Sequence, residues 1–337
     1  MKYYNKDLTF RAMFVLRKKN NSLEVKIKKT VLSEIYKKNF VIIKVSYSTI
    51  NHKDILVMNG NPGLVRKFPH IPGIDAAGKV IFSTSTKLKK NDKVAVIARP
   101  MGLTSMGGLS EYICVPIEWA NKLQNDISEK NSMIFGTAGY TAILIVLKII
   151  KDKKFDKKKP ILIIGSTTGV GLICSIILDF LKYNVILTIR NNKNKEVLKN
   201  IGFKKFINLK TIKEVNTMHL DKEKYTCIID TVGGEYVGNT IKQLAKKGNY
   251  YLVGNIAGQS SNLNLMPFIL RGINLVGINS ENATNTERKK IFSALENFSK
   301  IKKINKIFNM CKFEELNNTK NIFKKNNLFG RLIVKIN

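Results

Sequence analysis

The chain has 337 residues, with 58 Lys or Arg against 24 Asp or Glu, so its formal net charge at pH 7 is +34. Its hydrophobic fraction of 44% and aromatic fraction of 9% exclude a disordered chain and a collagen-like repeat, and its length suggests about two domains. Its four cysteines form no Cys-x-x-Cys pair and its N-terminus has no apolar signal stretch, so we expect a cytoplasmic protein without structural zinc.

The first third of the chain is predicted to form a small, mostly β domain. Short β-rich runs occur at residues 41–45, 93–98 and 113–115, and a further strand is expected after Asp75. Gly and Pro turn signals separate these runs. Short strands joined by such turns are typical of a β unit.

From about residue 125, strands and helices alternate. The expected helices are residues 133–150, 169–182 and 193–200, the last with Gly202 as its C-cap. The expected strands are residues 160–165, 184–189, 206–207, 225–230, 250–253 and 273–278. The first two are apolar on both faces, as in buried parallel strands. The alternation predicts a doubly wound α/β sheet with right-handed crossovers.

Residues 133–150 are apolar enough to be mistaken for a membrane span. The segment contains Gly and Thr residues, and Lys148 lies near its end, so we predict a buried helix and no membrane association. In the tail of the chain, helices are expected at 285–299 and 317–325 and a last strand at 331–336.

A glycine-containing turn follows the first strand of the alternating part. Residues 165–171 have the sequence GSTTGVG, between an apolar strand and an apolar helix. Glycine lets backbone N–H groups approach a pyrophosphate, and the helix presents its positive N-terminus to it. The context favours a dinucleotide site. The alternative is a tight packing turn without a ligand.

The end of the second strand indicates which nucleotide binds. Sites for NAD place an acidic residue there to bind the ribose 2′-hydroxyl, but residues 187–192 contain none. Arg190 can instead pair with a 2′-phosphate, and Thr188 and Asn191 can add neutral donors. We therefore expect NADPH. The alternative is that Arg190 is one more surface cation.

The excess of positive charge does not by itself indicate a nucleic-acid partner. The lysines are spread along the chain among Asn and Ile, which share A/T-rich codons, and no basic arm or helix-turn-helix pattern occurs. A nucleotide bias of the genome is our interpretation, and we expect no specific nucleic-acid partner. The alternative is a positive potential that attracts an anionic substrate and that salt would screen.

Taken together, these segments resemble the medium-chain dehydrogenase/reductases, and within them the zinc-free, quinone-oxidoreductase-like branch that includes acrylyl-CoA reductase. The resemblance covers essentially the whole chain and rests on residues 51–54 (NHKD), 68–75 (FPHIPGID), 107–112 (GGLSEY), 136–142 (GTAGYTA), 165–171, 230–233 (DTVG), 266–271 (MPFILR) and 330–335 (GRLIVK).

The resemblance implies a GroES-like β-barrel domain at residues 1–124, a Rossmann domain at 125–302 and a return to the first domain at 303–337, with the active cleft between them. It also implies a homodimer that pairs through the sixth strand, residues 273–278. The residues that it implies for cofactor binding are His52, Thr167, Thr168, Gly169, Val170, Thr188, Ile189, Arg190, Asn191, Asn255, Ile269, Ser280 and Arg331.

The chain departs from the family in several places. His52 stands where an aromatic Tyr is usual, Thr167 and Thr168 stand where Ser-Gly is common, and the alignment leaves Thr188 and Asn191 as alternatives for one role. Zinc members carry a His-Glu pair where this chain has Ile74-Asp75, and no Cys lies near Asn51. His52, His70 and Cys114 are not at a known ligand spacing, so we expect no metal.

Without a metal, the favoured reaction is reduction of a carbon–carbon double bond conjugated with a carbonyl, because hydrogen-bond donors can stabilise the delocalised enolate. The resemblance therefore implies a 2-enoyl thioester reductase that converts acrylyl-CoA to propanoyl-CoA with NADPH. The alternatives are a quinone or reactive-enone reductase and, outside enzymes, an NADP-binding regulatory module. His52 is the candidate catalytic proton donor, with a pure cofactor contact as its alternative role.

Overall fold

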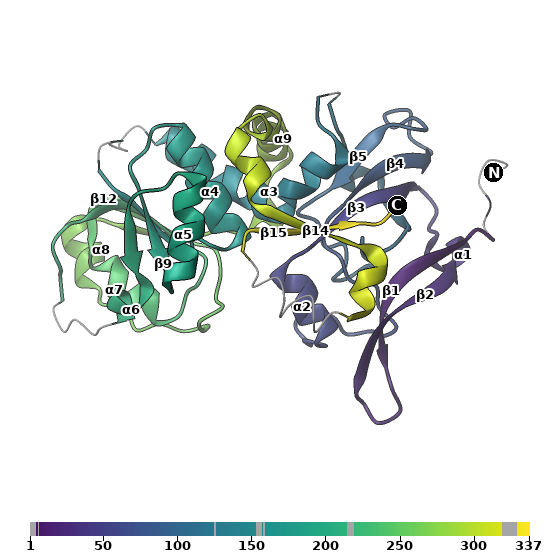
Figure 1. The fold of residues 1–337 in the computed structure, drawn as a ribbon, viewed down its shortest axis with the longest axis horizontal. Helices are drawn as coiled ribbons and strands as arrows, with labels where there is room; N and C mark the ends of the chain where they lie inside the picture. Colours follow the sequence, from purple (N-terminus) through teal and green to yellow (C-terminus); the bar gives the residue numbers. More distant parts are fainter. Residues whose placement is uncertain are drawn as a thin grey trace. The chain divides into compact units, whose positions relative to one another are not determined.

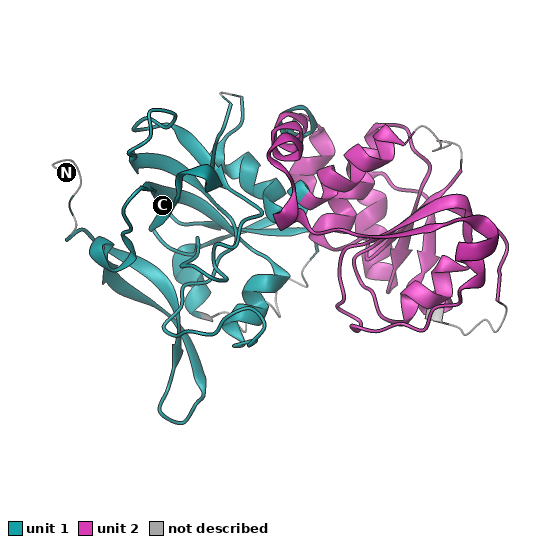
Figure 2. Ribbon diagram, turned by 180° about the vertical axis from the view of Figure 1, so that it is seen from behind, with its two compact units in different colours: residues 1–140, 295–299, 308–337 teal, residues 141–294, 300–307 magenta. Residues whose placement is uncertain are grey.

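The computed structural model describes residues 5, 7–124, 126–152, 157, 159–213, 219–318 and 329–337. The chain forms two compact units (Figure 2). Unit 1 comprises Met1–Tyr140, Leu295–Ser299 and Phe308–Asn337, and unit 2 comprises Thr141–Ala294 and Lys300–Ile307.

Unit 1 is built on a seven-stranded sheet, in which all pairings are antiparallel except that of β14 with β15. The strand order is β14-β15-β3-β4-β5-β7, and β6 pairs with β3. The bounds are β3 (Phe40–Ile50), β4 (Ala76–Phe82), β5 (Lys93–Val96), β6 (Tyr112–Pro116), β7 (Ala120–Lys122), β14 (Phe308–Lys312) and β15 (Arg331–Lys335). This sheet confirms the mostly β first domain.

A two-stranded hairpin adds to unit 1 and was not expected from the sequence. It consists of β1 (Thr9–Arg17) and β2 (Leu23–Val31), followed by the short helix α1 (Leu32–Ile35). Met13 and Val15 on one face join the main core, while Phe10 and Phe14 on the other face join a second cluster. β1 is apolar on both faces, so it lacks the alternation of a half-buried strand, whereas residues 23–28 of β2 (LEVKIK) do alternate, and this signal was not used.

Unit 2 contains a six-stranded parallel sheet. Its strands are β8 (Ile161–Ile164), β9 (Val185–Ile189), β10 (Phe206–Asn208), β11 (Tyr225–Asp230), β12 (Leu244–Leu252) and β13 (Asn274–Gly277). The spatial order is β10-β9-β8-β11-β12-β13, which is the 3-2-1-4-5-6 order of the doubly wound fold. All residues of β8 are buried, and so are those of β9 except the half-buried Ile186, so the double-faced burial predicted for these two strands is confirmed at all but one position. The strand order confirms the doubly wound sheet.

Helices cover both faces of this sheet, with α4 (Gly169–Phe180) and α5 (Asn192–Ile201) on one side and α7 (Glu235–Ile241) and α8 (Met266–Arg271) on the other (Figure 1). Gly202 caps α5 at φ +106°, as predicted. Besides α3, which is described below, the described residues also form the helices α2 (His52–Met58), α6 (Leu209–Lys213) and α9 (Asn285–Ser299). They include the 3₁₀ turns η1 (Ile117–Trp119), η2 (Ser280–Asn282), η3 (Lys302–Lys306) and η4 (Phe313–Asn318).

The helix α9 agrees with the expected helix at 285–299, and β15 with the expected last strand. The helix expected at 317–325 lies outside the described residues from position 319 onwards.

The long apolar helix α3 (Glu129–Lys151) is not continuous. Gly136 adopts φ +49° and ψ −155°, which breaks the helix into two parts, so the expectation of one unbroken helix at 133–150 was wrong. By length and composition α3 could cross a membrane, but 78% of its most apolar window is buried inside the protein. Such burial is typical of a core helix.

Candidate functional site

The turn after β8 is closed by hydrogen bonds, and neighbouring side chains leave no room for a Cβ at its first residue. Gly165 has φ +80°, and a Cβ there would overlap Thr231 and Val232. Thr168 donates its N–H (3.0 Å) and its hydroxyl (2.8 Å) to the Gly165 carbonyl, and its Oγ1 accepts the Gly171 N–H at 3.1 Å. Thr168 is therefore the N-cap of α4, and it fixes the turn.

The beginning of α4 is suited to a phosphate. The N–H groups of Gly169 and Val170 belong to the first turn, where a helix supplies no acceptor of its own. Thr167, Gly169 and Val170 are only half-buried, so these groups can reach a ligand. Gly171 packs against the Gly165 carbonyl, where a Cβ would overlap it. The predicted residues of this turn thus form a cradle that fits a pyrophosphate.

The end of β9 divides into a buried and an exposed part. Thr188 is 3% exposed, its Oγ1 accepts the Gly165 N–H at 3.0 Å, and its carbonyl accepts the Ser166 hydroxyl. Thr188 thus holds the turn in place. Arg190 and Asn191 are exposed, and Asn191 caps α5 by accepting the Asn194 N–H at 2.9 Å. Of the two alternatives for one role, Asn191 is the one that is accessible.

The other predicted contacts in unit 2 have different surroundings. Asn255 is exposed after β12, and its backbone lies beside Gly233, where a Cβ would come within 3.0 Å of the Asn255 Cα. Ile269 on α8 is 71% exposed, while Ser280 and Ile189 are buried. Their contacts with a nucleotide remain predictions.

Asp230 shapes the loop after β11. Its Oδ1 accepts the N–H groups of Val232 (2.7 Å) and Gly233 (3.0 Å), and its Oδ2 accepts the Tyr250 hydroxyl at 2.7 Å. Burial raises the pKa of this carboxyl above its usual value. In the sequence, residues 230–233 were singled out only by the family resemblance. The structure shows that the Asp230 carboxyl holds the loop through these buried hydrogen bonds.

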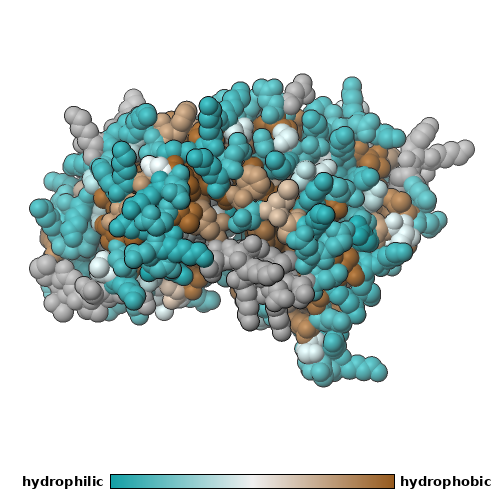
Figure 3. Space-filling view, in the orientation of Figure 1, coloured by the Kyte–Doolittle hydropathy of each residue, from teal (hydrophilic) through white to brown (hydrophobic). Residues whose placement is uncertain are grey.

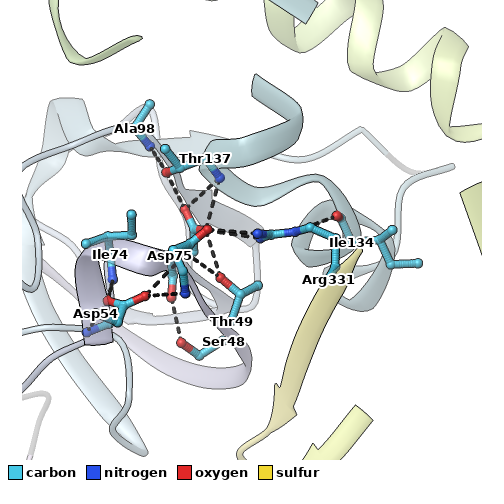
Figure 4. A network of polar contacts seen from close by, with 11 residues as sticks. Ser48, Thr49, Asp54, Ile74, Asp75, Ala98, Ile134, Thr137 and Arg331 are labelled. Carbon is cyan, nitrogen blue, oxygen red and sulfur yellow. Dashed lines mark hydrogen bonds and ion pairs between the residues drawn. The ribbon is translucent and has the colours of Figure 1, made fainter. Parts of the chain in front are cut away.

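Unit 1 contains a buried polar network around Asp75 (Figure 4). The Asp75 Oδ1 accepts the hydroxyl of Thr137 at 2.6 Å and its N–H at 2.9 Å, and Oδ2 accepts the Thr49 hydroxyl at 2.8 Å. Thr137 begins the second part of α3, so Asp75 caps that helix. The Thr137 Oγ1 in turn accepts the N–H of Ala98, which has φ +51°.

Asp54 is a second fully buried carboxylate in this network. Its Oδ1 accepts the N–H groups of Gly73 (3.0 Å) and Ile74 (2.9 Å), and its Oδ2 accepts the Asn51 N–H at 2.7 Å. Burial, and next the charge of Asp75, raise the pKa of Asp54 to about 7, against the opposing effect of these hydrogen bonds. The carboxyl therefore titrates near neutrality.

His52 and Arg331, the predicted contacts of unit 1, both adjoin the network. His52 is exposed and is the first residue of α2, directly after Asn51. Arg331 is 4% exposed and forms an ion pair with Asp75 at 3.5 Å. Sequence reasoning did not find the network as a unit. The three-residue spacing of Asn51 and Asp54, which is that of a capping box, was the available signal.

The possible metal ligands considered in the sequence do not converge. The His70 Nε2 lies 2.9 Å from the Gly102 carbonyl, and burial lowers the pKa of this imidazole. Cys114 contacts the backbone of Lys37. Over the described residues, no group of three or more His, Cys, Asp or Glu side chains could hold a metal ion.

Two family models match the chain. The alcohol dehydrogenase GroES-like domain matches residues 37–125, and a model described as zinc-binding dehydrogenase matches residues 169–298. The first match supports the GroES-like part of the predicted fold class. The description of the second is the name of a family and says nothing of a metal in this chain.

Curated relatives match nearly the full length. The chain is 31% identical over 309 residues to YhfP of Bacillus subtilis (strain 168), named among the quinone oxidoreductases, covering 91% of this chain and 94% of that protein. It is 29% identical over 297 residues to the acrylyl-CoA reductase AcuI of Ruegeria pomeroyi, covering 88% of this chain and 90% of that protein.

Solved structures agree with the fold. The yhdH oxidoreductase of Salmonella enterica in complex with NADP has a TM-score of 0.90 at 25% identity, covering 97% of this chain and 100% of that one. The Bacillus subtilis protein yhfP with NAD bound also has a TM-score of 0.90, at 29% identity over 98% of this chain and 100% of that one.

Proposed function

Because the chain belongs to the medium-chain dehydrogenase/reductase superfamily, we propose that it is an NADPH-dependent oxidoreductase that reduces the double bond of a 2-enoyl thioester. The specific reaction that we propose converts acrylyl-CoA, NADPH and a proton into propanoyl-CoA and NADP⁺. The similarity to acrylyl-CoA reductase over 88% of the chain supports this substrate.

The cofactor assignment depends chiefly on the residues at the end of β9. Arg190 directly follows this strand and is exposed, and no Asp or Glu lies there. A carboxylate would accept the 2′-hydroxyl of NAD and repel a 2′-phosphate, whereas a guanidinium attracts the phosphate. The NADP in the Salmonella enterica structure supports the same choice. The turn at Gly165–Gly171 would hold the pyrophosphate through its backbone N–H groups.

The chain's own residues have three tasks in this reaction. NADPH, when bound, supplies a hydride equivalent. The protein must orient the enoyl thioester, stabilise negative charge on the thioester oxygen with hydrogen-bond donors, and allow a proton to reach the α-carbon. His52 is exposed, and an imidazole is the commonest proton-transfer group in enzymes, so we propose it as the proton donor.

The role of His52 separates two mechanisms. If it donates the proton, His52→Tyr and His52→Phe should both lower kcat, and the limb of the pH–rate profile that it causes should vanish. If it only contacts the cofactor, His52→Tyr should retain most of the activity with an unchanged profile. A loss beyond about a thousandfold at unaltered NADPH affinity would establish the catalytic role.

The absence of the usual zinc-binding pair supports a metal-independent reaction. Ile74 replaces a histidine by an aliphatic side chain, and Asp75 is committed to hydrogen bonds with Thr49 and Thr137. Charge that develops on a conjugated thioester spreads over the enolate, so protein donors suffice. We therefore propose that the enzyme is zinc-independent.

The second candidate is a quinone or reactive-enone reductase, which the similarity to the quinone oxidoreductase-named YhfP favours. Parallel assays of NADPH oxidation with acrylyl-CoA and with a simple quinone distinguish the two. Tight NADPH binding without turnover of either substrate would indicate an NADP-binding regulatory module instead.

A further inference from the structure

Asn51 connects the two charged ends of the buried network in unit 1. Its Nδ2 donates to Asp75 Oδ2 at 2.9 Å, and its Oδ1 accepts from Arg331 Nη1 at 2.8 Å. An amide side chain has one donor end and one acceptor end. Here the donor end faces the carboxylate and the acceptor end faces the guanidinium, so the orientation of the amide depends on both charges.

The orientation of His52 depends on the same contacts. The helix α2 has seven residues, too few to be stable without tertiary contacts. Its first turn is held where Asn51 donates its N–H to Asp54, and Asp54 accepts from Gly73 and Ile74, which directly precede Asp75 in the chain. His52 therefore begins a helix whose start is fixed by the segment that carries Asp75.

Arg331 is held by the network but retains an unused donor. Its Nε donates to the Ile134 carbonyl at 3.1 Å, and Nη1 donates to Asn51. Its Nη2 lies 3.5 Å from Asp75 Oδ2 and has no hydrogen-bond acceptor among the described residues. A buried guanidinium is strongly desolvated, so the charge of Asp75 is needed to retain it there.

The break in α3 makes room for this ion pair. A Cβ at Gly136 would overlap both Asp75 Oδ2 and Arg331 Nη2. The glycine conformation also directs the Thr137 N–H toward Asp75. The backbone of α3 therefore leaves space for the Asp75–Arg331 ion pair and donates a hydrogen bond to the carboxylate. A residue that only filled space would require neither.

We infer that Asp75 is a positioning residue, whose carboxylate, acting through Asn51, sets the orientation of both His52 and Arg331. The consequence for nucleotide binding rests on the proposed function and on the NADPH contacts that the family resemblance implies for both residues. The orientation of the His52 and Arg331 side chains does not rest on the proposed function, and it can be measured without any ligand.

The first experiment uses NMR on the ligand-free protein. The chain has three histidines, so the imidazole signals of His52, His70 and His219 can be assigned by substitution. In Asp75→Asn, which keeps the size of the side chain and removes its charge, we expect shifts of the His52 imidazole signals and of the Arg331 Nε–H signal. The signals of His219, which lies in unit 2, should stay unchanged.

The second experiment measures NADPH affinity by fluorescence titration in a double-mutant cycle. We expect Asp75→Asn to weaken binding ~10-fold, and to have a much smaller effect in the Arg331→Lys background, because residues of one hydrogen-bond network do not act additively. Asp92→Asn is the matched control. Asp92 is a unit 1 carboxylate that accepts the Lys89 N–H at 2.8 Å and pairs with Lys122 at 2.7 Å, away from this network.

The inference is overturned if folded Asp75→Asn keeps the wild-type signals of His52 and Arg331, or if its effect on affinity adds fully to that of Arg331→Lys. If Asp75→Asn does not fold, Thr49→Val decides, because it keeps the shape of the side chain and the Asp75 charge while it removes a hydroxyl that donates to Asp75 Oδ2 and accepts from Asn51 Nδ2. It should shift the same two signals by a smaller amount, and unchanged signals would contradict the inference. A wild-type protein that fails to bind NADPH would refute the proposed function, while the ligand-free NMR would still test Asp75.

Discussion

At the scale of single residues, some polar side chains hold the site in place and others are accessible to a ligand. Thr188 and Asp75 are buried and engaged in hydrogen bonds, whereas Arg190 and His52 are exposed. The sequence could place these residues near a site through motif spacing. It could not assign the two roles, because burial of an individual polar group depends on contacts between distant segments.

Arg190→Ala tests the choice of nucleotide. A hydrogen bond to a charged group typically contributes ~1.5–3 kcal/mol, so NADPH binding should weaken by roughly ten- to a hundredfold. Binding of NADH, which lacks the 2′-phosphate, should change little. Dissociation constants for both nucleotides, measured side by side, check this, and equal losses for the two would refute the assignment.

Asp54 gives the stability of the protein a specific pH dependence. Its pKa is raised from 3.8 to about 7 in the folded protein, so between these values the folded state retains a proton that the unfolded state has lost. The contribution of protonated Asp54 to the free energy of unfolding is fully present below about pH 4, and it is lost as the pH rises through about 7.

Asp54→Asn isolates this effect, because an amide does not titrate. We expect the stability of the wild type, relative to that of Asp54→Asn, to decrease as the pH rises from about 4 to about 7. Denaturant unfolding of both proteins across this range measures the difference. A constant or increasing difference would show that the Asp54 carboxyl is ionised throughout.

At the scale of helices and strands, the apolar runs and the glycine positions of unit 2 predicted its strands and one helix cap. The fully apolar β8 and the αL cap at Gly202 are local features, so the sequence contains them. The hairpin of β1 and β2 and the break in α3 depend on distant partners. Gly136 breaks the helix where Asp75 and Arg331 occupy the space that a side chain would need, which no local pattern reveals.

Gly136→Ala tests whether the break in α3 is required. A methyl group there would overlap the ion pair and would also force alanine into φ +49°, so we expect a loss of stability of about 1–3 kcal/mol or more. Gly202→Ala is a useful comparison, because Gly202 also has a positive φ but its Cβ would approach only the flexible end of Lys303. If Gly136→Ala proved no more destabilising than Gly202→Ala, the ion pair would not need this space.

At the scale of the whole molecule, the positive charge is general rather than concentrated in a motif. Hydrophilic residues cover much of the face seen in Figure 3, with apolar residues between them. An exception is the stretch from residue 248 to residue 280, which contains a single charged residue, Arg271. Its guanidinium donates to the carbonyls of Asp221, Lys242 and Leu244, which gives the run at 266–271 a structural role.

The most direct test of the proposed function is the turnover of acrylyl-CoA and of a simple quinone by the purified protein with NADPH, before and after exhaustive treatment with a chelator. We predict NADPH oxidation with acrylyl-CoA, one equivalent of propanoyl-CoA for each NADPH consumed, a much lower kcat/KM for the quinone, and no effect of the chelator. Turnover of the quinone alone would contradict the substrate, and activity that is lost on chelation and restored by zinc would contradict the metal-independent mechanism.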